Sequence, residues 1–194
     1  MWNEKYQKTE FQYGTKPNDY IKQQLDGLPV GRILVPAAGE GRDAVYAAQL
    51  GWEVYAFDSS ERALDKALKL ASEHKVQIHF TCEDATKVQY PITSFDAIVL
   101  TYFHLPAELR KTFHQQCIKW LKPGGVIILE GFHKNQLGNT SGGPKDINWL
   151  FDTKTLQEDF NDLQFLELVE KQRILDEGPL HQGLAEVVQM CGRK

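Results

Sequence analysis

The fold is decided by residues 32–59, whose sequence is RILVPAAGEGRDAVYAAQLGWEVYAFDS. Residues 33–35 form a short apolar run that predicts a buried strand, and the small residues 37–41 after it predict a tight turn. Residues 44–50 have a helical composition that stops at a glycine, and residues 53–57 form a second apolar run. Strand, turn, helix and strand in this order are typical of a parallel β-sheet.

The turn and the acid that follows the second run predict a nucleotide pocket. Small residues let the backbone approach a ligand, and a helix that begins after such a turn points free N–H groups at it. Asp58 lies close to the spacing of about 20 residues at which an acid accepts hydrogen bonds from both ribose hydroxyls. Gly39 and Gly41 lack the third glycine that seats a pyrophosphate. A ligand without a pyrophosphate therefore fits better than a nicotinamide dinucleotide.

Composition and charge are those of an ordinary globular protein. The 194 residues are enough for one domain with a substantial core, and we expect a single domain over residues 1–194. A formal net charge of −4 gives no electrostatic basis for binding nucleic acid. The 3 cysteines are widely spaced and form neither a disulfide framework nor a zinc pattern, so no metal is expected. Because no apolar leader or membrane-spanning run is visible, we expect a cytoplasmic protein without a membrane partner, as a monomer or a dimer.

The rest of the chain continues the alternation of helices and strands. Residues 1–28 are polar with aromatics among them, and we interpret them as a helical cover over the edge of the sheet, with a second helix after Pro17. Further helices are expected from Ser59 or Ser60 onward, from Pro106 to Leu121 and from Thr153 to Phe160, and further strands at 77–82, 95–100, 126–130, 163–174 and 183–190. The fold class is therefore α/β: a Rossmann-like, open, mostly parallel sheet of seven strands, with helices on both faces and a C-terminal antiparallel hairpin.

Ligands of such a sheet bind beyond the carboxyl ends of its strands. The segments that directly follow predicted strands are 36–43, 58–60, 83–86, 101–105 and 131–149. The last of these segments overlaps an irregular stretch, residues 132–150, that is rich in Gly, Asn and Pro and long for a compact domain. We interpret this stretch as a lid loop and expect it to become ordered when the substrate binds.

Several motifs, taken in their order and spacing, resemble those of class I S-adenosylmethionine-dependent methyltransferases. More closely, the chain resembles the small bacterial group related to tellurite-resistance and thiopurine methyltransferases. The motifs are EFQYGTKPN at 10–18, AAGEGRD at 37–43, FDSS at 57–60, FHLP at 103–106, LKPGG at 121–125, SGGP at 141–144 and HQG at 181–183. The resemblance covers nearly the whole chain and implies S-adenosylmethionine as the cofactor. One departure is Val35, which stands where most families of this fold carry an acid, so we carry over no contact at that position.

The resemblance implies a role for each residue of the cofactor site. The methionine part would lie over the turn formed by Ala37, Gly39, Glu40 and Gly41, with Thr101 flanking it. Asp58, followed by Ser59, would hold the ribose hydroxyls. Asp84 would accept from the adenine amino group, and the backbone of Ala85 would complete adenine recognition. The alternative interpretations are a solvated acid at the end of a strand for Asp58 and a turn residue for Asp84.

The acceptor side is less specified by the sequence. Methyl transfer from a sulfonium mainly requires that acceptor and methyl be held in line, and a soft anion needs no strong general base. The resemblance favours a small molecule with a soft S, Se or Te nucleophile. The alternatives are O- or N-methylation of a small metabolite, or a non-catalytic protein that binds S-adenosylmethionine. The expected acceptor residues are Tyr102, Phe103, Phe132, His133 and His181, with His104 as the catalytic base.

Overall fold

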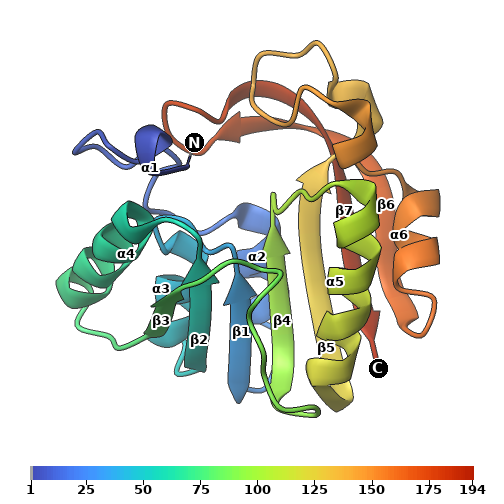
Figure 1. Cartoon of the computed structure of the whole chain (residues 1–194), viewed down its shortest axis with the longest axis horizontal. Coiled ribbons are helices and arrows are strands. Elements are labelled where there is room, and N and C mark those ends of the chain that lie inside the picture. The colour runs from blue at the N-terminus through green and yellow to red at the C-terminus, as the bar shows by residue number, and fades with distance from the viewer. Residues whose placement is uncertain (1) are drawn as a thin grey trace.

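The protein forms one mixed sheet of seven strands, as Figure 1 shows for the computed structural model, which describes residues 2–194. The strands are β1 (Arg32–Pro36), β2 (Glu53–Asp58), β3 (His79–Cys82), β4 (Phe95–Thr101), β5 (Leu121–Phe132), β6 (Gln164–Asp176) and β7 (Gln182–Arg193). Their order in the sheet is β3-β2-β1-β4-β5-β7-β6. The first five strands pair in parallel, and β7 lies antiparallel between β5 and β6. This arrangement confirms the predicted fold class, including the antiparallel C-terminal pair.

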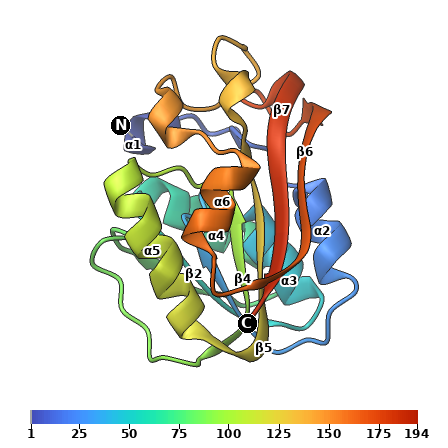
Figure 2. The same cartoon turned by 90° about the vertical axis from the view of Figure 1, so that its right-hand side faces the viewer.

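Helices cover both faces of the sheet because alternate strand residues point to opposite sides. In β1, Ile33 and Val35 pack in the core under α2 (Asp19–Leu25) and α3 (Arg42–Gln49), whereas Leu34 packs on the other face. The helices over that other face are α5 (Ala107–Trp120) and α6 (Thr153–Asp159), as seen from the side in Figure 2. The remaining long helix, α4 (Glu61–Glu73), packs against α3, β2 and β3.

The predicted helix starts are confirmed by their caps. Ser60 caps α4 by accepting a hydrogen bond from the N–H of Ala63, and Asp152 caps α6 by accepting from the N–H of Thr155. Pro106 is the residue before α5, where its missing N–H costs no helical hydrogen bond. The strand that follows α5 begins earlier than the predicted strand at 126–130. β5 begins at Leu121, which pairs with Phe95 before the register shifts.

The N-terminal residues lie differently from the prediction of a cover over the sheet edge. Asn18 caps α2, which buries Tyr20, Ile21 and Leu25 against one face of the sheet, because these three apolar side chains lie on one side of the helix. Only α1 (Trp2–Lys5) and the residues up to Tyr13 lie above the carboxyl ends of the strands, near α4. The N-terminal segment is therefore part of the core in its second half and a cover in its first half.

Three segments meet above the carboxyl ends of the parallel strands in Figure 1: α1, the loop after β5 and the turn between β6 and β7. The loop after β5 contains two short 3-10 helices, η1 (Lys134–Gln136) and η2 (Ile147–Trp149). The buried Gln136 side chain donates to Ser141 Oγ and to the carbonyl of Gly142, so it ties the loop to itself. Within residues 2–194, no helix is long and apolar enough to cross a membrane.

Candidate active site

The turn after β1 is built from backbone conformations that favour glycine. Gly39 and Gly41 have φ angles of +53° and +89°, and Ala37 also has a positive φ of 47°. A Cβ atom on Gly41 would lie 2.6 Å from Cβ of Ala67, so the missing side chain lets α3 and α4 approach each other. A Cβ atom on Gly39 would lie 2.9 Å from the hydroxyl of Tyr6. The turn therefore has room for a ligand or a neighbouring side chain only because these residues are small.

We predict that Gly41→Ala destabilises the fold by about 2–4 kcal/mol, because a positive φ and the contact with Ala67 both become unfavourable. Urea denaturation would measure this loss. Gly51→Ala is the matched control, since Gly51 has φ +97° with nothing within 4 Å of its would-be Cβ. We expect that control to cost about 1–2 kcal/mol, for the backbone alone. Equal losses in the two variants would contradict a packing role for Gly41.

Asp58 lies at the end of β2 and organises this turn. One carboxylate oxygen accepts from the N–H of Gly39 at 3.0 Å, and the other accepts from the N–H of Ser60 at 3.0 Å. Burial raises the pKa of Asp58, whereas these backbone N–H groups lower it. A carboxylate oxygen has two lone pairs, so each oxygen keeps capacity for one further donor, such as a ribose hydroxyl. Asp58 is therefore buried and bound to the turn, and it is not a solvated acid.

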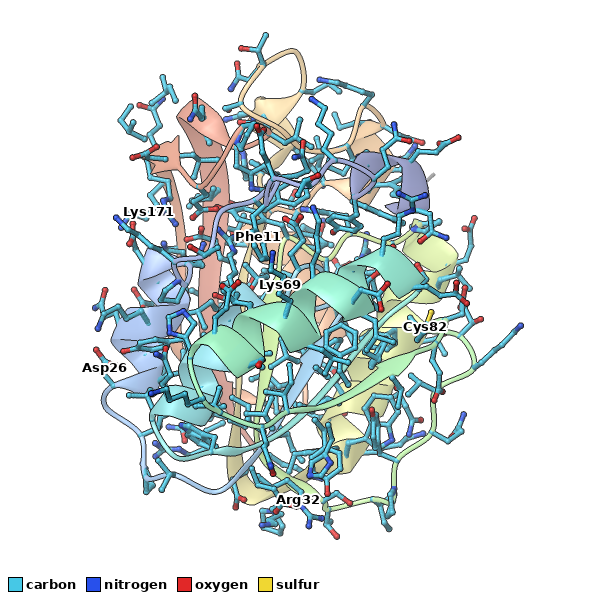
Figure 3. All side chains as sticks on the ribbon, turned by 90° about the vertical axis from the view of Figure 1, so that its left-hand side faces the viewer. Phe11, Asp26, Arg32, Lys69, Cys82 and Lys171 are labelled. Atoms are coloured by element: carbon cyan, nitrogen blue, oxygen red, sulfur yellow. The ribbon has the colours of Figure 1, made fainter. Side chains whose placement is uncertain are left out.

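The N-terminal segment covers the same turn. Asn3 Oδ1 accepts from the hydroxyl of Ser60 at 2.6 Å, and the buried Tyr6 lies against Gly39. Glu40, expected under the cofactor, instead accepts from the N–H of Tyr13 and from the ammonium of Lys66. In Figure 3, Phe11 of this segment lies above α4, and Arg32 lies at the opposite end of the molecule. Glu40 thus ties the N-terminal cover to α4.

The other expected cofactor residues lie at the same end of the sheet. Asp84 is exposed, and its Oδ1 accepts from the N–H and the hydroxyl of Thr86, as in a turn. Ala85 is half-buried beside the core cluster under α5, and Ser59 is exposed after β2. Thr101 ends β4, and its buried hydroxyl lies next to the carboxylate of Asp43 on α3. The turn of small residues and the strand-end carboxylate of Asp58 together fit the donors and acceptors of an adenosyl amino acid.

His104 has both ring nitrogens engaged with backbone groups. Nδ1 lies 2.7 Å from the carbonyl oxygen of Trp149, and Nε2 accepts from the N–H of Phe132 at 3.1 Å. Burial lowers its pKa to about 4, so the ring is neutral at pH 7. These contacts connect β5 to the loop after it and leave no ring nitrogen free to take a proton. The geometry therefore supports a structural role for His104 in place of the expected base.

His181 lies in the turn between β6 and β7, among aromatic side chains. Its ring makes edge contacts with the rings of Tyr13, Tyr102 and Phe132, at centroid distances of 4.6, 4.7 and 5.3 Å. A Cβ on Gly142 would lie 3.0 Å from His181 Nε2, so the absence of a side chain lets the loop backbone pack closely against this edge of the ring. Burial lowers the pKa of His181, and the ring is therefore neutral near pH 7. His181 thus combines a neutral imidazole with a nitrogen that no protein donor occupies.

The remaining acceptor candidates are only partly brought together. Tyr102, with a positive φ of 50°, stacks on Phe132 at 4.5 Å and donates from its hydroxyl to Glu130. Phe103 packs against Phe113 of α5, in the core cluster under that helix. His133 accepts from the N–H of Asn135 and lies 3.4 Å from Glu170 of β6. Of the five expected acceptor residues, those whose rings contact one another are therefore Tyr102, Phe132 and His181.

A buried charged network below these aromatics was missed by sequence reasoning. Glu130, fully buried at the end of β5, accepts from Asn18, Tyr102, Arg173 and Gln189. Glu177 accepts from Asn18 and Arg42 and forms an ion pair with Arg173. Glu130 could have been noticed in the sequence, because it is a charged residue in the otherwise apolar run 126–130. Glu177 gave no comparable signal, because an acid in the sequence Asp-Glu-Gly-Pro is typical of a surface turn.

Comparison with known proteins relates this chain to methyltransferases. Residues 33–125 match the family model described as a methyltransferase domain. The chain is 26% identical over 179 residues to a thiopurine S-methyltransferase from Legionella pneumophila (strain Corby), covering 81% of this chain and 77% of that protein. It is 33% identical over 135 residues to probable thiol methyltransferase 2 from Arabidopsis thaliana, covering 66% and 58%. The crystal structure of TehB from Haemophilus influenzae superposes with a TM-score of 0.75 at 19% identity, covering 100% of this chain and 65% of that one.

The fold, the turn after β1 and these matches define the protein as an S-adenosylmethionine-dependent methyltransferase. Among such enzymes, the chain is similar in sequence to the thiopurine S-methyltransferases of Legionella pneumophila and similar in fold to TehB. It is therefore an enzyme of the small-molecule type, as its sequence motifs predicted.

Proposed function

We propose that the enzyme methylates the sulfur of a small, uncharged thiol and that His181 accepts the proton of that thiol. S-adenosylmethionine, when bound, supplies a methyl group already activated by a sulfonium charge. Asp58, the turn at 37–41 and Thr101 are the residues that would hold it. The residues of the chain would then orient the acceptor, exclude water and remove one proton.

The observation that supports this proposal most directly is the surroundings of His181. A free thiol has a pKa of about 8.5 and is mostly protonated at pH 7, so a neutral imidazole beside it raises the thiolate fraction. The edges of Tyr13, Tyr102 and Phe132 form apolar, polarizable walls at 4.6–5.3 Å from the His181 ring. Such walls suit a soft sulfur better than a hydrated alcohol or ammonium.

The charges near the site argue against an oxyanion as the acceptor. The buried guanidinium of Arg42 is paired with Glu177, and that of Arg173 is paired with Glu130 and Glu177. The ammonium of Lys66 is paired with Glu40. An oxyanion that bound to one of these three cations would have to displace its carboxylate, which costs free energy. The names of two similar proteins, a thiopurine S-methyltransferase and a probable thiol methyltransferase, favour the same acceptor class.

A panel of acceptors with labelled S-adenosylmethionine tests the acceptor class. We expect turnover of small thiols that exceeds that of phenols, amines, selenite and tellurite. Turnover of phenols or amines without thiols would replace the proposal by O- or N-methylation. Turnover of the oxyanions without thiols would contradict the argument from paired cations.

The same assay tests the base. We expect His181→Asn to lower kcat for thiols by about 10²–10⁴-fold, the usual contribution of a general base, with unchanged cofactor affinity. Because the base acts in its neutral form, wild-type kcat/KM should fall as the pH drops through the His181 pKa, which burial places below the ordinary 6.5. His114→Gln is the control: His114 is also buried beside a carboxylate, Asp159, but it lies on α5. A loss of kcat in the control as large as in His181→Asn would contradict a specific role for His181.

A further inference from the structure

Glu177 joins four parts of the chain. Its Oε2 accepts from Arg42 of α3 at 2.9 Å, and its Oε1 accepts from Asn18, the cap of α2, at 3.0 Å. Arg173 of β6 lies 3.2 Å from Oε1. Oε2 also lies 3.5 Å from Nδ1 of His181, which is longer than an ordinary hydrogen bond. Glu177 is buried, with 8% of its side chain exposed.

The backbone around Glu177 fixes this position. The N–H of Glu177 donates to the carbonyl of His181, which closes the turn between β6 and β7. The N–H of Leu180 donates to the carbonyl of Gln12. A Cβ on Gly178 would lie 2.4 Å from the backbone nitrogen of Gly14, so the turn lies directly against the N-terminal segment. The carboxylate is therefore held by backbone packing as well as by its ion pairs.

We infer that Glu177 is a positioning residue that sets the tautomer and the proton affinity of His181. A carboxylate near Nδ1 favours the tautomer that carries its proton on Nδ1, which leaves Nε2 as the proton acceptor. Nε2 lies at the edge of the ring that the Gly142 backbone approaches closely, since a Cβ there would come within 3.0 Å of it. The use of this tautomer in catalysis rests on the function proposed above, whereas the effect of Glu177 on His181 does not.

The charges that face His181 act in opposite directions. Burial lowers its pKa, and the positive charges of Arg42 on α3 and of Lys5 at the end of α1 lower it further. Glu177 raises it. The other polar groups packed on the ring are the hydroxyls of Tyr13 and Tyr102, and burial raises the pKa of both so that they stay uncharged at neutral pH. Glu177 is thus the nearby negative charge that keeps the proton affinity of His181 high enough for a base.

Two-dimensional NMR of the ring protons, with His181 assigned from a His181→Asn spectrum, tests this inference without any activity. We expect the His181 pKa to fall in Glu177→Gln, because a negative charge is lost while Arg42 and Arg173 remain. Asp19→Asn is the matched control: Asp19 also pairs with Arg173, but its side chain is 88% exposed, and we expect no change in the His181 pKa. An unchanged pKa in Glu177→Gln would overturn the inference.

Kinetics give a second readout. In Glu177→Gln we expect kcat for thiols to fall about 10- to 100-fold, less than after loss of the base itself. The acidic limb of kcat/KM should also move to lower pH, which a purely structural loss would not do. An unmoved limb with wild-type kcat would overturn the positioning role. If wild-type enzyme turns over no thiol but the NMR shift is present, the proposed acceptor fails and the effect of Glu177 on His181 stands.

A second variant, Glu177→Asp, tests the inference if Glu177→Gln does not fold. Glu177→Asp keeps the negative charge and withdraws the carboxylate by one methylene. We expect the His181 pKa to fall in this variant as well, but by less than in Glu177→Gln. Circular dichroism establishes that each variant is folded before its pKa is measured. If Glu177→Gln does not fold and Glu177→Asp shows the wild-type pKa, Glu177 does not set the proton affinity of His181.

Discussion

Asp58→Ala should abolish measurable binding of S-adenosylmethionine and S-adenosylhomocysteine in a calorimetric titration. A carboxylate that accepts two ribose hydroxyls makes two charge-assisted hydrogen bonds, each contributing about 1.5–3 kcal/mol. Losing both weakens affinity by about 10²–10⁴-fold. Asp58 also accepts from the N–H groups of Gly39 and Ser60, so the variant loses the geometry of the turn as well. The effect should therefore lie at the upper end of that range.

The control for this experiment is Asp65→Ala, which removes an exposed carboxylate from α4. It should leave the affinity unchanged, since the residue lies away from the turn. Asp58→Asn separates the two roles, because the amide keeps one acceptor oxygen but places a donor against a backbone N–H. A dissociation constant for Asp58→Ala within about threefold of wild type would exclude a ribose contact. No binding by the wild type would instead remove the turn as a cofactor site.

Glu130→Ala should cost about 3–5 kcal/mol of the free energy of unfolding, measured by urea denaturation. Glu130 is fully buried and accepts hydrogen bonds from four side chains, including the buried guanidinium of Arg173. Removing the carboxylate leaves that cation with only Glu177 and the exposed Asp19 as counter-ions and leaves the Tyr102 hydroxyl without its acceptor. Breaking a buried pair is expensive for this reason, since the remaining charge stays desolvated.

Glu170→Ala is the matched control for Glu130→Ala. Glu170 is exposed on β6 and accepts from the N–H and hydroxyl of Thr153. Its loss should cost no more than about 1 kcal/mol, because exposed charges are well solvated in both states. Similar losses in the two variants would contradict the view that the Glu130 network stabilises this end of the sheet. Glu130→Gln should fall between them, since it keeps one acceptor oxygen.

Local patterns predicted the elements well because they depend on neighbours in the sequence. The run at 33–35 and the stripe of apolar residues after Ser60 each form the predicted element, and Ser60 and Asp152 cap their helices. The turn at 37–41 has the positive φ angles that its glycines suggested. Asp58 was placed at the end of its strand by spacing alone. These features are set within one turn or one strand, where propensity and hydrophobic period act directly.

The surroundings of the two candidate histidines became known only from the tertiary structure. His104 directly follows β4, as a base in such an enzyme would, but its ring is held by the backbones of Phe132 and Trp149. His181 lies at the far end of the chain, and only the antiparallel insertion of β7 beside β5 brings it to Tyr13 and Tyr102. Which ring nitrogen is free depends on hydrogen bonds between distant segments, and no local pattern records them.

The sequence by itself determined the class of fold, the turn at 37–41 and the similarity to methyltransferases, because each depends on short-range periodicity and on motifs of fixed spacing. The tertiary structure alone decided which side chains surround His181. Glu130 and Glu177 meet Asn18 and Arg173 only after the sheet order β4-β5-β7-β6 and the strand registers are set. Burial then makes these charges interdependent, since a carboxylate removed from water is stable only with partners that the fold supplies.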